Sequence, residues 1–269
     1  MKLSAAFSIL LDLRFAVHEA FLPTILVIIR SPSLLLEPSA ISRLFMAKLW
    51  VTFGDGVDEN SRPVKEHLIT PNAYGVVLDI GAGHGHCVSY LDKTRVTRYV
   101  ALEPNALMHQ HIRAVANEAG FNESDGTLLL LTCGAEDAAS IVSSIAGDTN
   151  QQPVDTLISI LTLCTVPTPE RTLASIVGNV LKPGGQLLFY EHVLSPKTDV
   201  AWWQRFWTPV WSLAFDGCKL DRPTHLWIEE LTDDQSESFW SEQATWGKDG
   251  EPEDNLFWHR VGRMVKRAS

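Results

Sequence analysis

The sequence predicts an α/β protein built on a doubly wound, mostly parallel β-sheet with an N-terminal helical cover. Three observations predict this fold class. Short, continuous apolar runs follow one another from residue 76 onward, helix-length segments separate them, and a glycine-rich turn directly follows the first run. Continuous apolar strands are buried on both faces, which is typical of parallel sheets covered by helices on both sides.

Each apolar run is an expected strand, and each intervening segment is an expected helix. The expected strands are residues 76–80, 98–103, 127–132, 155–161 and 186–193. The expected helices are near residues 86–91, 105–119, 135–145 and 169–181. Beyond this core, the polar and acidic stretch at residues 232–254 is expected to be a surface excursion before a last strand near residues 257–266.

The chain divides into an N-terminal segment, residues 1–70, and a main domain, residues 71–269. Apolar side chains at three- and four-residue spacing predict a helix over residues 38–53. The Gly-Asp-Gly sequence at residues 54–56 is expected to end that helix, and a second helix is expected over residues 61–69.

The first thirty residues are apolar, but Asp12, Arg14 and Pro23 interrupt them. A membrane-spanning helix needs about 20 apolar residues in succession, so no transmembrane helix is expected here. Two interpretations of the segment stay open. It is either a helical lid on the domain or a stretch that lies in a membrane interface.

Charge and cysteine content restrict the partners and the compartment. The 32 Asp and Glu residues outnumber the 22 Lys and Arg residues, which gives the 269-residue chain a formal net charge of −10. A nucleic-acid partner is disfavoured, because binding phosphates requires a basic face. The four cysteines are far apart and show no CxxC spacing, so neither a metal site nor a disulfide framework is expected. The expected compartment is the reducing cytoplasm.

The strongest motif is the glycine-rich segment at residues 76–86, VVLDIGAGHGH, which contains Asp79, Gly81, Gly83 and Gly85. Glycines after a strand let the backbone turn tightly and approach a ligand closely. Glu103 ends the second apolar run 24 residues after Asp79, where a carboxylate accepts hydrogen bonds from a ribose diol. In this order the two features indicate an adenosine-containing cofactor.

These motifs resemble those of the class I methyltransferases, which use S-adenosylmethionine (SAM) and have a Rossmann-like fold. The resemblance implies that the glycine loop faces the methionine part of SAM and that Glu103 holds the ribose. It also implies that Ala135 and Glu136, in the segment CGAEDA, contact the adenine. Leu161, at the end of the fourth apolar run, completes the expected cofactor-binding set. LKPGG, at residues 181–185, matches another signature of this superfamily.

The C-terminal half carries a closer resemblance. FYEHV at residues 189–193, followed by FDGC at residues 215–218, is similar to the methyltransferase-like seven family, whose characterised members are microsomal thiol methyltransferases. Similar small enzymes methylate hydroxyl groups in fungal secondary metabolism. The resemblance therefore implies methyl transfer to a small molecule and leaves both acceptor atoms open.

Two residues are candidates for the acceptor side. His192 stands at the carboxyl end of the fifth strand, where open α/β sheets bind their ligands, and is interpreted as a base or acceptor-orienting residue. Asp216 is interpreted as a residue that orients an imidazole or contacts the acceptor. The competing interpretations are a structural histidine and a turn-capping aspartate.

The chain has nine tryptophans, and five of them lie between Trp202 and Trp227. Trp203, Trp207 and Trp211 recur every four residues and would form one aromatic stripe on a helix. Three interpretations stay open for this stripe: ordinary core packing, an apolar roof over the acceptor, and an interfacial membrane belt.

Together these features predict a methyl transfer from SAM to a small hydrophobic acceptor. A hydroxyl acceptor is preferred, such as one on a polyketide or other secondary metabolite. The reason is that the sequence shows no pair of reactive cysteines that would adapt the site to a thiol acceptor. The alternatives are S-methylation of small alkyl thiols, and a SAM-binding cyclase or scaffold without methyl transfer. A peripheral position on an intracellular membrane, through the N-terminus or the tryptophan stripe, is the alternative to a purely cytoplasmic one.

Overall fold

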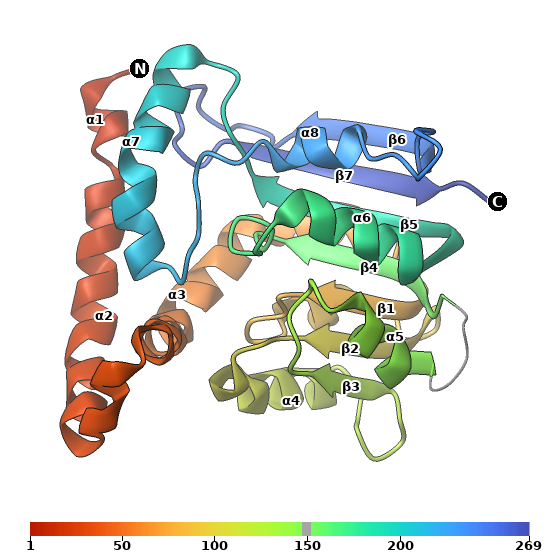
Figure 1. Ribbon diagram of the computed structural model, residues 1–269, viewed down its shortest axis with the longest axis horizontal. Helices are drawn as coiled ribbons and strands as arrows, with labels where there is room; N and C mark the ends of the chain where they lie inside the picture. Colours follow the sequence, from red (N-terminus) through yellow and green to blue (C-terminus); the bar gives the residue numbers. More distant parts are fainter. Residues whose placement is uncertain (147–151, 269) are drawn as a thin grey trace.

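The computed structural model describes residues 1–146 and 152–268, which form a seven-stranded sheet in the order β3-β2-β1-β4-β5-β7-β6 (Figure 1). The strands are β1 (Gly75–Ile80), β2 (Val96–Leu102), β3 (Leu128–Leu131), β4 (Val154–Ile160), β5 (Leu181–His192), β6 (Trp240–Gly247) and β7 (His259–Lys266). β1 to β5 are parallel, and β7 runs antiparallel to β5 and β6. The predicted fold class and the five predicted strands of the core are confirmed.

Helices lie before the sheet in the chain and between its strands. They are α1 (Leu3–Ala6), α2 (Ile9–Arg30), α3 (Pro38–Leu68), α4 (His109–Glu118), α5 (Ala138–Ala146), α6 (Pro169–Asn179), α7 (Thr198–Ala214) and α8 (Thr224–Glu229). Three short 3₁₀ helices are η1 (Pro32–Leu36), η2 (His86–Tyr90) and η3 (Ala106–Met108). The helix expected near residues 86–91 is therefore a 3₁₀ turn, whereas the other three predicted core helices are confirmed.

Both faces of the sheet are covered, which explains the continuous apolar runs. Leu78 of β1 packs in one core cluster with side chains of α5, α6 and α8. The neighbouring Val77 packs on the opposite face with the end of α3, η2 and α4. Successive side chains of a strand point to opposite faces, so a strand buried on both sides must be apolar at nearly every position.

The N-terminal segment departs from the prediction, because α3 is one continuous helix and does not end at residues 54–56. Gly54 packs directly on the Trp50 indole, where an added Cβ would lie 2.9 Å from the Trp50 Nε1 atom. Pro63 is also accommodated inside the helix. Tertiary packing of one face of α3 therefore outweighs the low helix propensity of its glycines and proline.

A second departure lies in the polar stretch before the last strand. Residues 232–254 were expected to be a surface excursion, but they contain β6, which pairs with β7 at the edge of the sheet. Trp240 of this strand is buried, whereas Ser241, Glu242, Gln243 and Ala244 are exposed. An edge strand with so many solvated side chains lacks the apolar run by which the central strands were found.

α1, α2 and α7 lie side by side at one end of the molecule, although α7 is far from the other two in sequence (Figure 1). Phe7 makes edge-to-face contacts with Trp203 and Trp207, at centroid distances of 5.3 and 5.9 Å. Trp207 Nε1 also donates a hydrogen bond of 2.8 Å to the Ala6 carbonyl. Within residues 1–146 and 152–268, no helix combines the length and apolarity needed to cross a membrane.

Replacing Trp207 tests how firmly α7 holds the N-terminal helices. Trp207 is 8% exposed and Trp202 on the same helix is 56% exposed. Trp207→Ala removes a packed indole and leaves the Ala6 carbonyl without its donor, so we expect a loss of about 3 kcal/mol in unfolding free energy. The matched control, Trp202→Ala, should cost less than about 0.5 kcal/mol. Urea unfolding of both variants gives the comparison, and equal losses would contradict this packing role.

Candidate functional site

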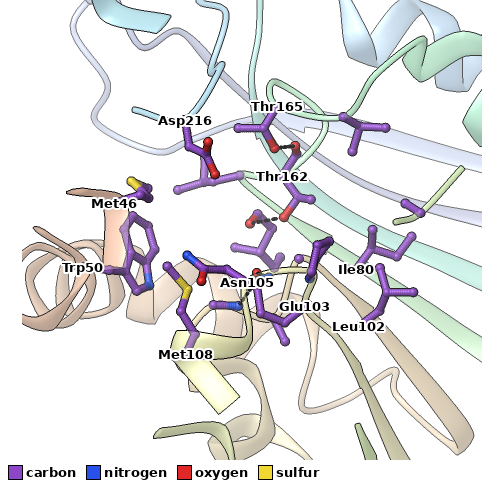
Figure 2. A pocket seen from close by; sticks show the side chains of 18 of the residues that line it. Met46, Trp50, Ile80, Leu102, Glu103, Asn105, Met108, Thr162, Thr165 and Asp216 are labelled. Atoms are coloured by element: carbon purple, nitrogen blue, oxygen red, sulfur yellow. Dashed lines mark hydrogen bonds between the residues drawn. The ribbon is translucent and has the colours of Figure 1, made fainter. Parts of the chain in front are cut away.

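A cavity of about 460 Å³ lies at the carboxyl ends of β1, β2 and β4. The sheet order reverses between β1 and β4, and open α/β sheets bind their ligands at such a switch point. Figure 2 shows Met46 and Trp50 of α3 on one side of this cavity, with Ile80 and Leu102 on the side of the sheet.

The predicted glycine loop forms one wall of this cavity, which we call the first cavity. Gly81 and Gly83 line it and have φ angles of +67° and +58°. An added Cβ at Gly81 would lie 2.4 Å from Thr162 Cγ2, and one at Gly83 would lie 2.9 Å from Trp50 Nε1. Both positions therefore require glycine. Gly85 does not line the cavity but makes the turn into η2 at a φ of +84°.

Glu103 lines the first cavity at the end of β2, where its carboxylate is held by the backbone. The N–H groups of Gly83 and Asn105 donate hydrogen bonds of 2.9 and 2.8 Å to its two oxygens. Burial raises the pKa of Glu103 to about 7, although these hydrogen bonds oppose the rise. Each carboxylate oxygen has more than one lone pair, so Glu103 keeps acceptor capacity for a hydroxyl-bearing ligand.

Asp79 does not line the first cavity. It is buried beneath the glycine loop and accepts a hydrogen bond of 2.7 Å from the Tyr99 hydroxyl. Burial raises its pKa to about 6. Asp79 therefore supports the loop from inside the protein, and the side chain is not among those that face the cavity.

The other three predicted cofactor residues, Ala135, Glu136 and Leu161, all line the first cavity. Leu161 has a φ of +54°, which is costly for a leucine and persists only where surrounding contacts impose it. Glu191 supplies such contacts. Its buried carboxylate accepts hydrogen bonds from the backbone N–H groups of Thr162 and Leu163, directly after Leu161.

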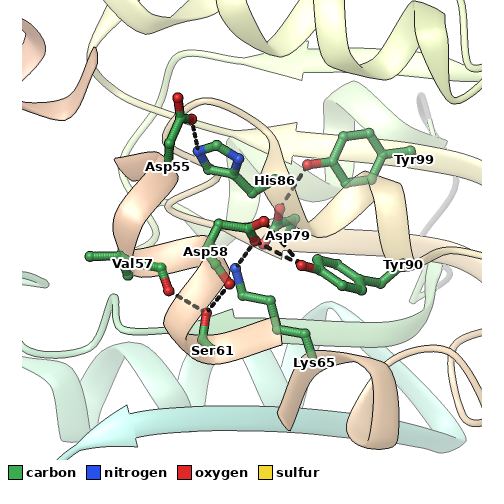
Figure 3. Close-up of polar contacts among 9 residues, drawn as sticks. All are labelled: Asp55, Val57, Asp58, Ser61, Lys65, Asp79, His86, Tyr90 and Tyr99. Atoms are coloured by element: carbon green, nitrogen blue, oxygen red, sulfur yellow. Dashed lines mark hydrogen bonds and ion pairs between the residues drawn. The ribbon is translucent and has the colours of Figure 1, made fainter. Parts of the chain in front are cut away.

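Helix α3 contributes a group of polar residues that sequence reasoning missed (Figure 3). Lys65 Nζ donates a hydrogen bond of 2.7 Å to Asp58, and the Tyr90 hydroxyl donates to the same carboxylate at 3.0 Å. Lys65, Asp58 and His86 line the first cavity beside the glycine loop. Such charged groups suit the amino and carboxylate ends of an amino-acid moiety. The helical spacing of α3 predicted a buried face but not its charges.

A second cavity of about 330 Å³ adjoins the first. The residues common to the two linings are Met46, Trp50, Val57, Leu161 and Thr165. The remaining wall includes five aromatic side chains, Phe53, Tyr190, Trp211, Phe215 and Phe257, and the polar side chains of Asp12, Asn60, Ser61, Lys248 and Asn255. A chamber that is partly aromatic and partly polar therefore opens beside the cofactor-type cavity.

The tryptophan stripe of α7 serves more than one of its predicted roles. Trp207 packs in the core against the N-terminal helices. Trp211 lines the second cavity and stacks on Phe215 at a centroid distance of 3.6 Å. Trp202 and Phe206 are stacked on each other and exposed. Core packing and an apolar wall beside the second cavity are therefore both observed.

His192 and Asp216 lie in different cavities. His192 lines the second, and its Nε2 atom is 3.3 Å from Cys218 Sγ. Asp216 lines the first and accepts a hydrogen bond of 3.1 Å from Ser42. The expected role of Asp216 in orienting an imidazole is not supported at His192, because the group beside that ring is a cysteine.

The contact between His192 and Cys218 affects both side chains. Burial lowers the pKa of His192, but the charge and hydrogen bonding of Cys218 outweigh it and raise the pKa. Burial likewise raises the pKa of Cys218, and the contacts with Cys164 and His192 bring it well below its usual value. The spacing of the cysteines did not predict this contact, because His192 belongs to β5 and Cys218 to the segment after α7. Both residues nevertheless lie in FYEHV and FDGC, the two motifs that carry the closer family resemblance.

A family model described as a methyltransferase domain matches residues 55–228. The thiol S-methyltransferase TMT1B of Rattus norvegicus is 44% identical over 78 residues, which cover 29% of this chain and 32% of that protein. The thiol S-methyltransferase TMT1A of Homo sapiens is 43% identical over 80 residues, with coverage of 29% and 32%. The chain thus matches about a third of the length of these curated relatives.

Solved structures share the fold. An O-methyltransferase family protein from Burkholderia thailandensis superposes with a TM-score of 0.57 at 12% sequence identity. The match covers 86% of this chain and 60% of that one. At this identity the similarity concerns the fold alone.

If Glu103 holds the ribose of SAM as the resemblance implies, its pKa makes cofactor binding dependent on pH. Ribose hydroxyls donate to the ionised carboxylate, so bound SAM should lower the pKa of Glu103 below the value of about 7 that it has in the SAM-free protein. Binding then releases a proton below pH 7, and affinity falls as the pH falls. We expect SAM to bind about tenfold more weakly at pH 6 than at pH 8.

Glu103→Gln is the matched control, because it keeps the shape and cannot ionise. The variant should bind SAM at least about tenfold more weakly at pH 8, since the charge-assisted hydrogen bonds are lost. It should also lose the pH dependence assigned to Glu103. Calorimetric titration of both proteins measures this, and an equal pH dependence in the two would contradict the assignment.

Proposed function

The chain belongs to the methyltransferase-domain family, and from this premise we propose that it methylates the sulfur of a small hydrophobic thiol. The family model matches 55–228, which is more than half of the chain. This membership supports SAM-dependent methyl transfer to a small molecule as the activity of the protein. The acceptor atom and the site of action in the cell are further parts of the proposal.

The observation that carries the proposal is the pair of adjoining cavities. When bound, SAM supplies an electrophilic methyl group on a sulfonium sulfur. Gly81, Gly83 and Glu103, which line the first cavity, would hold it there. We assign the second cavity to the acceptor and call it the acceptor cavity, because its five aromatic side chains favour a molecule with an apolar body. In-line methyl transfer needs mainly this positioning of two reactants across a shared wall.

Sulfur is proposed over oxygen because of what the acceptor cavity contains. The sequence favoured an oxygen acceptor because its cysteines are far apart and form no evident pair. The structure brings Cys164 and Cys218 together around His192, and all three line the acceptor cavity. The partial similarity to thiol S-methyltransferases agrees with a thiol acceptor.

The acceptor loses its S–H proton to water before transfer, because the thiolate is the nucleophilic form. The thiolate sulfur then forms a bond to the methyl carbon while the bond between that carbon and the sulfonium sulfur breaks. The bonding electrons stay on the departing sulfur, so a thioether and S-adenosylhomocysteine result. In this reaction His192 and its two cysteine neighbours are positioned to orient the acceptor sulfur.

Isosteric acceptors test the choice of atom. An aryl thiol and the phenol of the same carbon skeleton are incubated with methyl-labelled SAM, and labelled product and S-adenosylhomocysteine are quantified. We expect the thiol to have a kcat/KM at least about a hundredfold higher, because a site adapted to sulfur discriminates against the hydroxyl. Glu103→Gln serves as the cofactor-binding control and should lower both rates.

The other outcomes decide between the alternatives. Transfer to the phenol alone would assign oxygen and overturn the proposal. Tight SAM binding without S-adenosylhomocysteine from any acceptor tested would instead favour a cyclase or scaffold.

We also propose that the protein lies peripherally on the cytoplasmic side of an intracellular membrane, with α1, α2 and α7 against the lipid. These helices expose a series of large apolar side chains: Leu3, Leu10, Leu11, Phe15, Val17, Phe21, Leu22, Leu26, Ile29, Trp202, Phe206, Val210 and Leu213. Apolar surface of this extent marks an interaction site. A hydrophobic acceptor would be concentrated in the same lipid.

Flotation with phosphatidylcholine vesicles tests this surface. Leu11 and Leu213 are 71% and 81% exposed and are not part of either cavity lining. The double variant Leu11→Gln, Leu213→Gln should bind vesicles at least about tenfold more weakly, because two leucines no longer enter the lipid. Leu226→Gln, on α8, is the control and should bind as the wild type does. No difference between the two variants would contradict the surface.

A further inference from the structure

Three buried side chains with metal-binding atoms meet in the acceptor cavity. They are Cys164 in the segment after β4, His192 at the end of β5, and Cys218 in the segment after α7. Their donor atoms all lie within 4.8 Å of one another. Three distant parts of the fold therefore converge on one point.

The donor set and spacing suit zinc. Zn²⁺ binds cysteine sulfur at about 2.3 Å and histidine nitrogen at about 2.0 Å, which puts a sulfur and a nitrogen of one tetrahedral site about 3.6 Å apart. His192 Nε2 and Cys218 Sγ are 3.3 Å apart. Since no two donor atoms are more than 4.8 Å apart, each pair lies within about 1 Å of the separation in a tetrahedral site.

The surroundings hold the cluster in place. Arg222 donates hydrogen bonds of 2.6 and 2.7 Å to the carbonyls of Leu163 and Val166, on either side of Cys164. Glu191 accepts a hydrogen bond from the Leu163 N–H. Two cysteine thiolates and one Zn²⁺ ion are together neutral before a fourth ligand binds. Charge neutrality lowers the cost of burying an ion.

The cluster also lies where the two cavities meet. Leu161 and Thr165, which line both cavities, flank Cys164 in the sequence. Asp216, two residues before Cys218, lines the first cavity, whereas Cys218 lines the acceptor cavity. Three protein ligands and one position open to a cavity are the arrangement of catalytic zinc sites, whereas structural sites use four protein ligands.

We propose that Cys164, His192 and Cys218 bind one Zn²⁺ ion whose fourth position takes the sulfur of the acceptor. This inference rests on the proposed thiol methylation. Coordination to zinc lowers the pKa of a thiol, so the acceptor binds as a thiolate and its proton passes to water. The thioether product carries no negative charge on sulfur, is a weak ligand and leaves the ion.

Metal content and cobalt spectra of the full-length protein test the site. The protein is reduced with a phosphine, freed of metal with a chelator and titrated with Zn²⁺ alone in competition with a chromophoric chelator. We expect one Zn²⁺ per chain. Co²⁺ in its place should give the sulfur-to-cobalt charge-transfer band and the intense visible bands of tetrahedral thiolate coordination.

Single substitutions define the ligands. Cys164→Ser, His192→Gln and Cys218→Ser should each lower zinc affinity at least about a hundredfold, since loss even of a supporting hydrogen bond costs tenfold or more. Cys133→Ser is the matched control, because Cys133 lies outside the cluster and should leave zinc affinity unchanged. SAM affinity, which depends on the first cavity, verifies that each variant is folded.

Two results would overturn the metal site. One is that the reduced wild type binds no more zinc than Cys164→Ser. The other is that Cys133→Ser lowers zinc affinity as much as the cluster variants do. Thiol methylation at an unchanged rate in the metal-free protein would overturn the proposed role of zinc and leave the thiol function standing. Zinc binding with no thiol methylated would keep the metal site and overturn both the thiol function and the acceptor as the fourth ligand.

Discussion

The buried carboxylate of Glu191 fixes the chain segment that separates the two cavities. It accepts hydrogen bonds from Ser159 Oγ at 2.7 Å and from the N–H groups of Thr162 and Leu163 at 3.1 and 3.2 Å. A carboxylate without exposed surface is tolerated only where such donors replace water. These bonds hold Leu161 in its unusual backbone conformation. They therefore fix the position of a side chain that lines both cavities, between the cofactor and the acceptor.

Helix α3 forms another part of the wall shared by the two cavities. Met46 and Trp50 project from it into both cavities, and Trp50 lies directly over Gly83 of the glycine loop. A helix that stopped at residues 54–56 could not reach from this contact to Lys65, whose amine pairs with Asp58 beside the loop. The continuity of α3 is thus tied to the site, because residues in its first half and near its C-terminal end both line the first cavity.

The sequence predicted the elements whose signals are local. Apolar runs located β1 to β5, and motif order placed Gly81, Gly83 and Glu103 at the first cavity. The rest depends on contacts between distant residues. Gly54 predicts a helix end from the sequence, but in the folded chain it packs on Trp50 within α3. The solvated edge strand β6 has no apolar run from which it could be predicted. The cysteines show no motif spacing, because β5 and the segment after α7 bring Cys218 to His192 only in the folded chain.

The contrast between the two cavities matches the charge change of the proposed reaction. A sulfonium and a thiolate carry opposite charges, and their reaction gives two neutral thioethers, so charge is lost on the way to the transition state. Apolar surroundings favour such a step, provided that the ground-state charges are held by fixed groups rather than by water. Glu103, Asp58 and Lys65 provide polar groups on the cofactor side, and Trp50 and Leu161 exclude water at the shared wall. On the acceptor side, the Zn²⁺ ion proposed for the cluster of Cys164, His192 and Cys218 would be the fixed cation that an acceptor thiolate needs.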